Sequence, residues 1–140
     1  MRLPLRTPLL VLALTVLAAA PSAAQARGGG GGGGGGGDRP EVRVAGVCGH
    51  GARSSLKLKS RDGAIQAEFE VDQNRNGRLW QVVFVHERRV EWRGRARTAA
   101  PSGSFSVERS LADFAGSDQV MARAVGPGGI TCQATTTLPG

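Results

Sequence analysis

Arginines are the residues of this 140-residue chain with the clearest capacity to bind a ligand. The segment 89–97 reads RVEWRGRAR, so on a strand all four of its arginines would share one face. Arginine forks bind phosphate, sulfate and carboxylate groups bidentately. The segment predicts a candidate face for an anionic polymer at a cell surface, formed by Arg89, Arg93, Arg95 and Arg97.

The same charge has a second interpretation. Charged side chains on an outer or edge strand prevent edge-to-edge aggregation, and Glu87 and Glu91 are close in sequence. Nucleic acid is not expected as a partner, because only Trp92 interrupts the arginines where a binding surface would interleave stacking aromatics.

Cys48 and Cys132 are the only cysteines. In an exported chain they predict a disulfide. In the chain-entropy model a bridge across such a long loop stabilises the fold by about 4–5 kcal/mol, so we expect a structural role. The alternative, a zinc site with His50 and His86, has no usual ligand spacing.

The segment 72–77, DQNRNG, resembles the first half of a calcium loop. The position that should supply a bidentate glutamate is Val83, and Arg75 and Arg78 add repulsion. We therefore expect a turn, with no metal and no cofactor.

Catalytic motifs are weak. There is no Gly-x-Ser-x-Gly, and Ser54-x-x-Lys57 is a common chance match. Glu68, Glu70 and Asp72 alternate as carboxylates on a solvated face usually do. We expect no enzyme, and a small hydrolase with an unrecognised site remains the alternative. Sugar recognition usually needs exposed aromatic side chains, but five aromatic residues occupy strand positions that face the predicted core: Phe69, Trp80, Phe84, Trp92 and Phe105. This argues against a carbohydrate-binding module.

Two alternating stretches must form the frame for these residues. Residues 65–71 and 80–84 alternate apolar and polar side chains, which is typical of strands. Asn76-Gly77 lies between them and favours a tight turn, so we expect a hairpin over 65–85. Asp62-Gly63 predicts another turn.

The remaining segments give about eight short strands at regular spacing and no helical period. This pattern predicts an all-β antiparallel sandwich of about 7–8 strands. We expect the domain to cover 41–138.

Residues 1–26 read as a signal peptide, with Arg2 and Arg6 before an apolar run and a small-residue cleavage site ending at Ala26. The apolar run is short for a membrane span, so an uncleaved anchor is the less favoured alternative. Residues 27–40 contain ten consecutive glycines and are expected to be a disordered linker. This linker is either a flexible tether or a glycine repeat whose sequence is under no functional constraint. Cleavage removes two of 18 basic residues and none of 11 acidic ones, leaving 16 − 11 = +5.

The tail from Ala115 to Ala124, followed by a Gly-rich turn and ITCQA at 130–134, resembles the last two strands of bacterial immunoglobulin-like or fibronectin type III-like domains. Residues 41–138 as a whole are similar to small exported proteins of GC-rich bacteria without an assigned activity. The resemblance implies an immunoglobulin-like fold and no catalytic residue. The chain departs from it in having no tyrosine and in placing its cysteines near the two ends of the domain.

Together these observations predict a secreted, monomeric, non-enzymatic interaction or structural module without a membrane span after cleavage. Its partner would be an extracellular protein or an anionic cell-surface polymer.

Overall fold

The structure is a computed structural model that describes residues 40–140. The predicted signal peptide and nearly all of the predicted glycine linker lie outside the described residues. The strands of the described residues form two antiparallel sheets, which confirms the prediction of an all-β antiparallel sandwich. The elements are β1 (Glu41–Ala45), β2 (Val47–Cys48), β3 (Arg53–Arg61), β4 (Ala64–Asp72), β5 (Leu79–His86), β6 (Arg89–Arg97), β7 (Ser104–Ala112), β8 (Asp118–Val125), a 3-10 turn η1 (Pro127–Gly129) and β9 (Thr131–Leu138).

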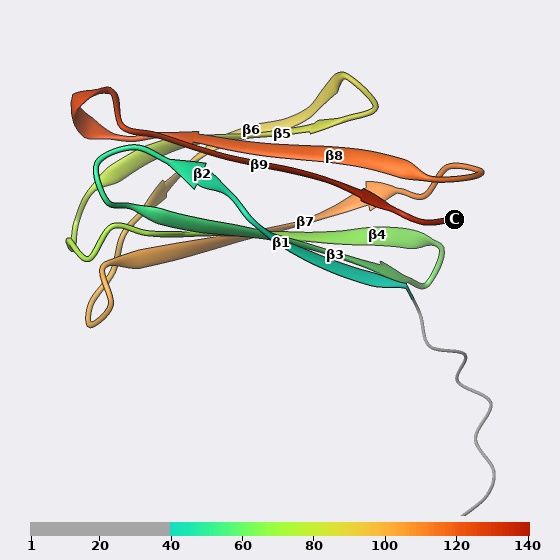
Figure 1. The fold of residues 1–140 in the computed structure, drawn as a ribbon, viewed down its shortest axis with the longest axis horizontal. Helices are drawn as coiled ribbons and strands as arrows, with labels where there is room; N and C mark the ends of the chain where they lie inside the picture. The colour runs from blue at the N-terminus through green and yellow to red at the C-terminus, as the bar shows by residue number, and fades with distance from the viewer. Residues whose placement is uncertain (1–39) are drawn as a thin grey trace, which may run out of the picture. The chain divides into compact units, whose positions relative to one another are not determined.

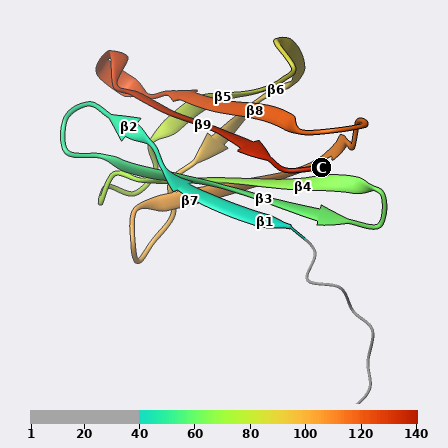
Figure 2. The same cartoon turned by 45° about the vertical axis from the view of Figure 1, so that its right-hand side comes forward.

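The strands are divided between two layers, which Figures 1 and 2 show from two directions. The first sheet has the order β1-β3-β4-β7, and the second has the order β2-β9-β8-β5-β6. The first segment of the domain contributes to both layers, because the chain leaves the first sheet at Gly46. A side chain there would meet the Ser54 hydroxyl at 2.2 Å and the Gln133 carbonyl at 2.7 Å, so glycine is required where the chain crosses.

The expected hairpin over 65–85 is wrong. β4 pairs with β3 and β7, whereas β5 pairs with β6 and β8, so the segment 73–78 crosses between the sheets. Buried Thr98 fixes this crossing: its hydroxyl accepts from the Arg78 N–H at 2.9 Å and donates to the Arg75 carbonyl at 2.6 Å. Asn-Gly signals a change of direction, but it does not specify which strands then pair.

Three hairpins do form, and two of them have two-residue turns. Asp62 and Gly63 have φ angles of 54° and 74°, as the Asp-Gly signal predicts. Glu87 and Arg88 join β5 to β6 with φ angles of 45° and 66°. The second turn therefore places two residues with bulky side chains in a backbone region that favours glycine.

The inward-facing residues of both sheets form one core. Phe69 of β4 meets Phe84 of β5 edge-on, with ring centroids 6.4 Å apart, and thereby links the layers. The rings of Trp80 on β5 and Phe105 on β7 also link the layers, with centroids 5.9 Å apart and planes tilted by 55°. Four of the five aromatics predicted for the core are buried, and Trp92 is partly buried against them.

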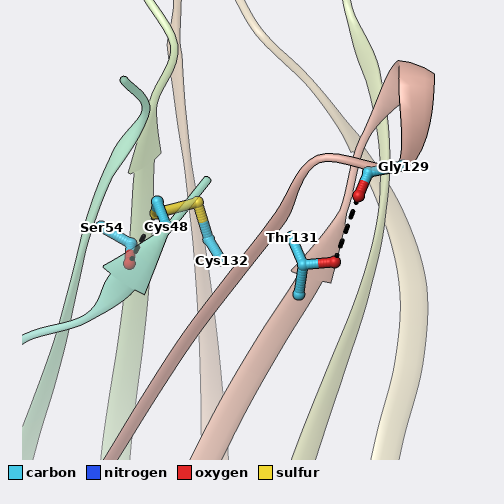
Figure 3. Close-up of a disulfide and its surroundings, with 5 residues drawn as sticks. All are labelled: Cys48, Ser54, Gly129, Thr131 and Cys132. Atoms are coloured by element: carbon cyan, nitrogen blue, oxygen red, sulfur yellow. Dashed lines mark hydrogen bonds between the residues drawn. A yellow bond between two sulfur atoms is a disulfide. The ribbon is translucent and has the colours of Figure 1, made fainter. Parts of the chain in front are cut away.

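The predicted disulfide between Cys48 and Cys132 is present (Figure 3). The two residues lie directly opposite each other on β2 and β9, with Cα atoms 4.1 Å apart. The Ser54 hydroxyl lies 3.3 Å from the Cys48 sulfur. Because both sulfurs are bonded to each other, the alternative zinc site is not formed.

Candidate anion-binding surface

The outer face of the second sheet carries a row of arginines on its edge strand, β6. Arg93, Arg95 and Arg97 are exposed, and they alternate with partly buried residues of the inner face. Their register partners on β5 are Val83, Gln81 and Leu79, whose side chains lie on the outer face of that strand. Three of the four arginines singled out in the sequence therefore share one face.

Arg89 does not share that face. The β5–β6 register shifts between Phe84 and Val85, which leaves Glu91 without a register partner. An extra residue in a β-bulge reverses the alternation beyond it. Arg89 is consequently opposite His86, whose side chain is buried on the inner face of the sheet. Simple counting along the sequence missed this reversal.

A fourth arginine joins the row from another strand. Arg123 of β8 is exposed, and its register partner on β5 is Val83. Val83 is also the partner of Arg93 on the other side of β5. The alternation over 120–124 indicates that Arg123 faces outward, but nothing in the residue types indicates that β8 lies beside β5.

A hollow lies over this part of the sheet. The residues that line it include two arginines, one glutamine and two valines: Arg93, Arg123, Gln81, Val83 and Val125. We call the exposed set Arg93, Arg95, Arg97 and Arg123 the arginine face.

The first sheet is charged as well, but several of its cations form ion pairs with carboxylates. Lys57 pairs with Glu68 at 2.5 Å, and Arg43 pairs with Glu70 at 3.3 Å. The hydrogen bond with Glu68 raises the pKa of Lys57, and the same bond lowers the pKa of Glu68. Two of the three carboxylates that the sequence placed on a solvated face, Glu68 and Glu70, are thus paired with cations.

The arginine face has no such neutralisation. β2, β5 and β9 contain no carboxylate, β8 contains only the buried Asp118, and β6 contains only Glu91, at its bulge. Over residues 40–140, none of the four arginines has a carboxylate within ion-pair distance. Arg97 donates to the Gly77 carbonyl at 2.6 Å. Positive charge is therefore concentrated on one side of the sandwich, where it attracts anions.

A pair of polar side chains, one of them at the end of β5, is buried in the domain. His86 Nε2 and Asp118 Oδ1 are 2.6 Å apart, and both side chains are almost fully buried. The ring of half-exposed Phe114 stacks on the imidazole at 4.8 Å. Glu87 also has a carboxylate oxygen close to this pair.

This cluster has the composition of a metal site but not its spacing. Two ligands of one tetrahedral zinc ion are about 3.3 Å apart, given metal–ligand bonds of about 2.0–2.2 Å. The shorter separation between His86 and Asp118 is that of a direct hydrogen bond. We therefore interpret the pair as a structural link between β5 and β8.

The structure also shows the contacts of the residues that the sequence raised for catalysis and for calcium binding. Ser54 packs against the disulfide, and Lys57, three residues later on the same strand, faces outward to Glu68. An odd spacing on a strand puts the two side chains on opposite faces, so they do not meet. Asp72, the first residue of the calcium-like segment, accepts the Asn74 N–H at 2.8 Å and caps its own turn.

Comparisons of the chain with protein-family models, with curated proteins and with solved structures find no significant match. The site must therefore be interpreted from its own residues. Between residues 40 and 140, no helix is both long and apolar enough to cross a membrane.

Proposed function

We propose that this protein is a secreted, non-enzymatic binding module that attaches to an anionic polymer outside the cell through the arginine face. The observation that carries the proposal is the contrast between the two sheets. In the first sheet Lys57, Arg43 and Lys59 are matched with Glu68, Glu70 and Glu41. The four arginines of the second sheet have no carboxylate partner among residues 40–140.

The arrangement fits a polymer better than a single small anion. Alternate residues on a strand are about 6.6–6.8 Å apart, so Arg93, Arg95 and Arg97 present three charges at a regular interval. Each contact at an exposed site is weak and is screened by salt. Several contacts to one chain add up, because all but the first are intramolecular.

Protection against aggregation is the rival explanation. β6 is an edge strand, and charge on an edge strand discourages pairing with another copy. Arg123 favours the binding proposal, since it lies two strands inside the edge, where it cannot serve that purpose.

Retention on a heparin column tests the proposal. We expect the oxidised secreted protein to elute at higher salt than a variant in which Arg93, Arg95, Arg97 and Arg123 are serine. The matched control replaces four cations of the first sheet, Arg43, Arg53, Lys57 and Lys59, by serine, which changes the net charge equally. Equal losses in the two variants would show that net charge alone is responsible and would overturn the proposal.

The hydrolase alternative has less support, because no nucleophile meets a base among the described residues that the sequence singled out. A broad hydrolase screen with the purified protein is expected to show no turnover. Turnover above that of a denatured sample would revive this alternative.

We also propose that the sandwich is of the immunoglobulin-like type. We further propose that the protein is exported from the cell after removal of residues 1–26. The order β9-β8-β5-β6 matches the G-F-C-C′ order of variable-type domains. The first sheet departs from the A-B-E-D order, because the neighbour of β3 is its own hairpin partner β4. Edman sequencing of the secreted protein is expected to start at Arg27, and a start at Met1 would contradict export by cleavage.

A further inference from the structure

We propose that the hollow over Val83 is a subsite for one tetrahedral oxyanion, a sulfate or phosphate ester group, which Arg93 and Arg123 bind from opposite sides. This inference rests on the proposed function and specifies its ligand. It predicts a polymer that bears such ester groups rather than one that bears only carboxylates.

The pairing of the strands creates the subsite. Arg123 on β8 and Arg93 on β6 both lie opposite Val83, so the three residues form one row across the sheet. Neighbouring strands are about 4.8 Å apart, which separates the two arginine Cα atoms by about 10 Å. The central residue is a short, apolar valine, over which two long arginine side chains can approach the same group.

The surroundings favour an anion at this point. Both arginines line the hollow, and so does Gln81, whose side-chain amide is a hydrogen-bond donor. Val83 and Val125 provide an apolar floor. No carboxylate among residues 40–140 forms an ion pair with either arginine, so both remain available to a ligand.

The geometry of the donors selects the shape of the anion. A planar carboxylate has two oxygens in one plane and is matched by a single arginine fork. A sulfate or phosphate monoester has three free oxygens arranged tetrahedrally, so it can accept from two forks on opposite sides and from an amide. Arg95 and Arg97 have no such opposing partner, and we expect them to contribute attraction that depends only on charge.

Three dextran polymers of equal length and equal substitution provide the test: dextran sulfate, phosphorylated dextran and carboxymethyl dextran. Affinities for the oxidised secreted protein are measured by calorimetric titration at fixed ionic strength. We expect dextran sulfate, which matches carboxymethyl dextran in charge, to bind about tenfold more tightly than it. The phosphorylated polymer shows which ester is preferred, and preference for either one over carboxymethyl supports the subsite.

Lysine variants separate shape from charge. Arg93→Lys with Arg123→Lys keeps the net charge but removes both forks, so we expect the preference to fall below about threefold. Arg95→Lys with Arg97→Lys is the matched control and is expected to keep the full preference. Circular dichroism serves to check that both variants are folded.

The possible failures are distinguishable. If none of the three polymers binds the unmodified protein, the proposed function itself is wrong. If all three bind with equal affinity, or if the preference survives the loss of both forks, the polymer-binding function stands and the subsite is overturned.

Discussion

The guanidinium carbon of Arg109 lies 3.9 Å from the centroid of the Trp92 indole ring. Arg109 belongs to β7 and Trp92 to β6, which are edge strands of different sheets. Their register partners, Ala67 and Phe84, are buried, so both side chains are on inner phases. The stack therefore closes a side of the sandwich where β6 and β7 do not pair with each other.

Replacing this arginine is expected to weaken the domain. Arg109→Ala should reduce the free energy of unfolding by about 1–2 kcal/mol, because it removes a cation–π contact and exposes the indole. Urea unfolding followed by tryptophan fluorescence measures the change. Arg95→Ala, which removes an exposed arginine without a partner, should stay within about 0.5 kcal/mol. Equal effects would contradict the closing role of Arg109.

Gly94 is expected to tolerate no side chain. A Cβ atom there would lie 2.1 Å from Cζ2 of Trp92, so Gly94→Ala must displace the indole. We expect a loss of about 1–3 kcal/mol in the free energy of unfolding. Gly49→Ala is the control, because a Cβ atom at that position meets nothing within 4 Å. A stable Gly94→Ala variant with unchanged tryptophan fluorescence would show that the indole packs differently.

The disulfide should contribute much of the stability of the domain. Its sequence separation is 84 residues, for which the chain-entropy model gives about 4–5 kcal/mol. We expect Cys48→Ser with Cys132→Ser to lower the urea midpoint by a corresponding amount, and dithiothreitol to do the same to the unmodified protein. Mass spectrometry that detects two free thiols in freshly secreted material would refute the pairing.

The buried pair of His86 and Asp118 is expected to behave as one unit. Asp118→Ala leaves the imidazole buried without its partner, which should cost about 3–5 kcal/mol of unfolding free energy. Changing both residues to leucine should cost less than the sum of the two single leucine changes, because no polar group is then left unpaired. Additive losses would mean that the hydrogen bond at 2.6 Å adds nothing to stability.

The pair of Lys57 and Glu68 predicts a pH dependence with a defined sign. The pKa of Glu68 is lowered below its ordinary value of 4.5, so its contribution is present above pH 4.5 and is lost as the pH falls through the lower folded-state value. The pKa of Lys57 is raised above 10.5, so its contribution is lost only as the pH rises beyond that.

Both side chains are about one-third exposed, and the pair should contribute only about 0.2–1 kcal/mol. We expect Glu68→Gln to lower the urea midpoint at about pH 7 and to have no effect at about pH 2, where the carboxyl is protonated in both states. Glu91→Gln, at the bulge, is the control with no change at either pH. A difference that persists at low pH would contradict the ionic origin.

Alternation in the sequence was sufficient to find the strands and their inner faces. Phe69, Trp80, Phe84 and Phe105 were expected in the core and are buried there. Residues of a strand alternate for local reasons, because successive side chains point to opposite faces whatever the strand pairs with. The cysteine pair was predictable for a similar reason, since there was no other thiol to choose.

Pairing was not predictable in the same way. β4 and β5 were expected to form a hairpin, yet they lie in different sheets, because backbone hydrogen bonds are alike for every pair of strands. The bulge that removes Arg89 from the arginine face leaves no mark in the residue types around Glu91.

By itself, the sequence determined that the domain is all-β, which residues face its core and which two sulfurs are joined. Only the tertiary structure decided that Arg123 lies beside Val83 and Arg93. The reason is physical: the side-chain period is a property of one strand, whereas a surface row needs three strands whose order depends on how the two layers pack.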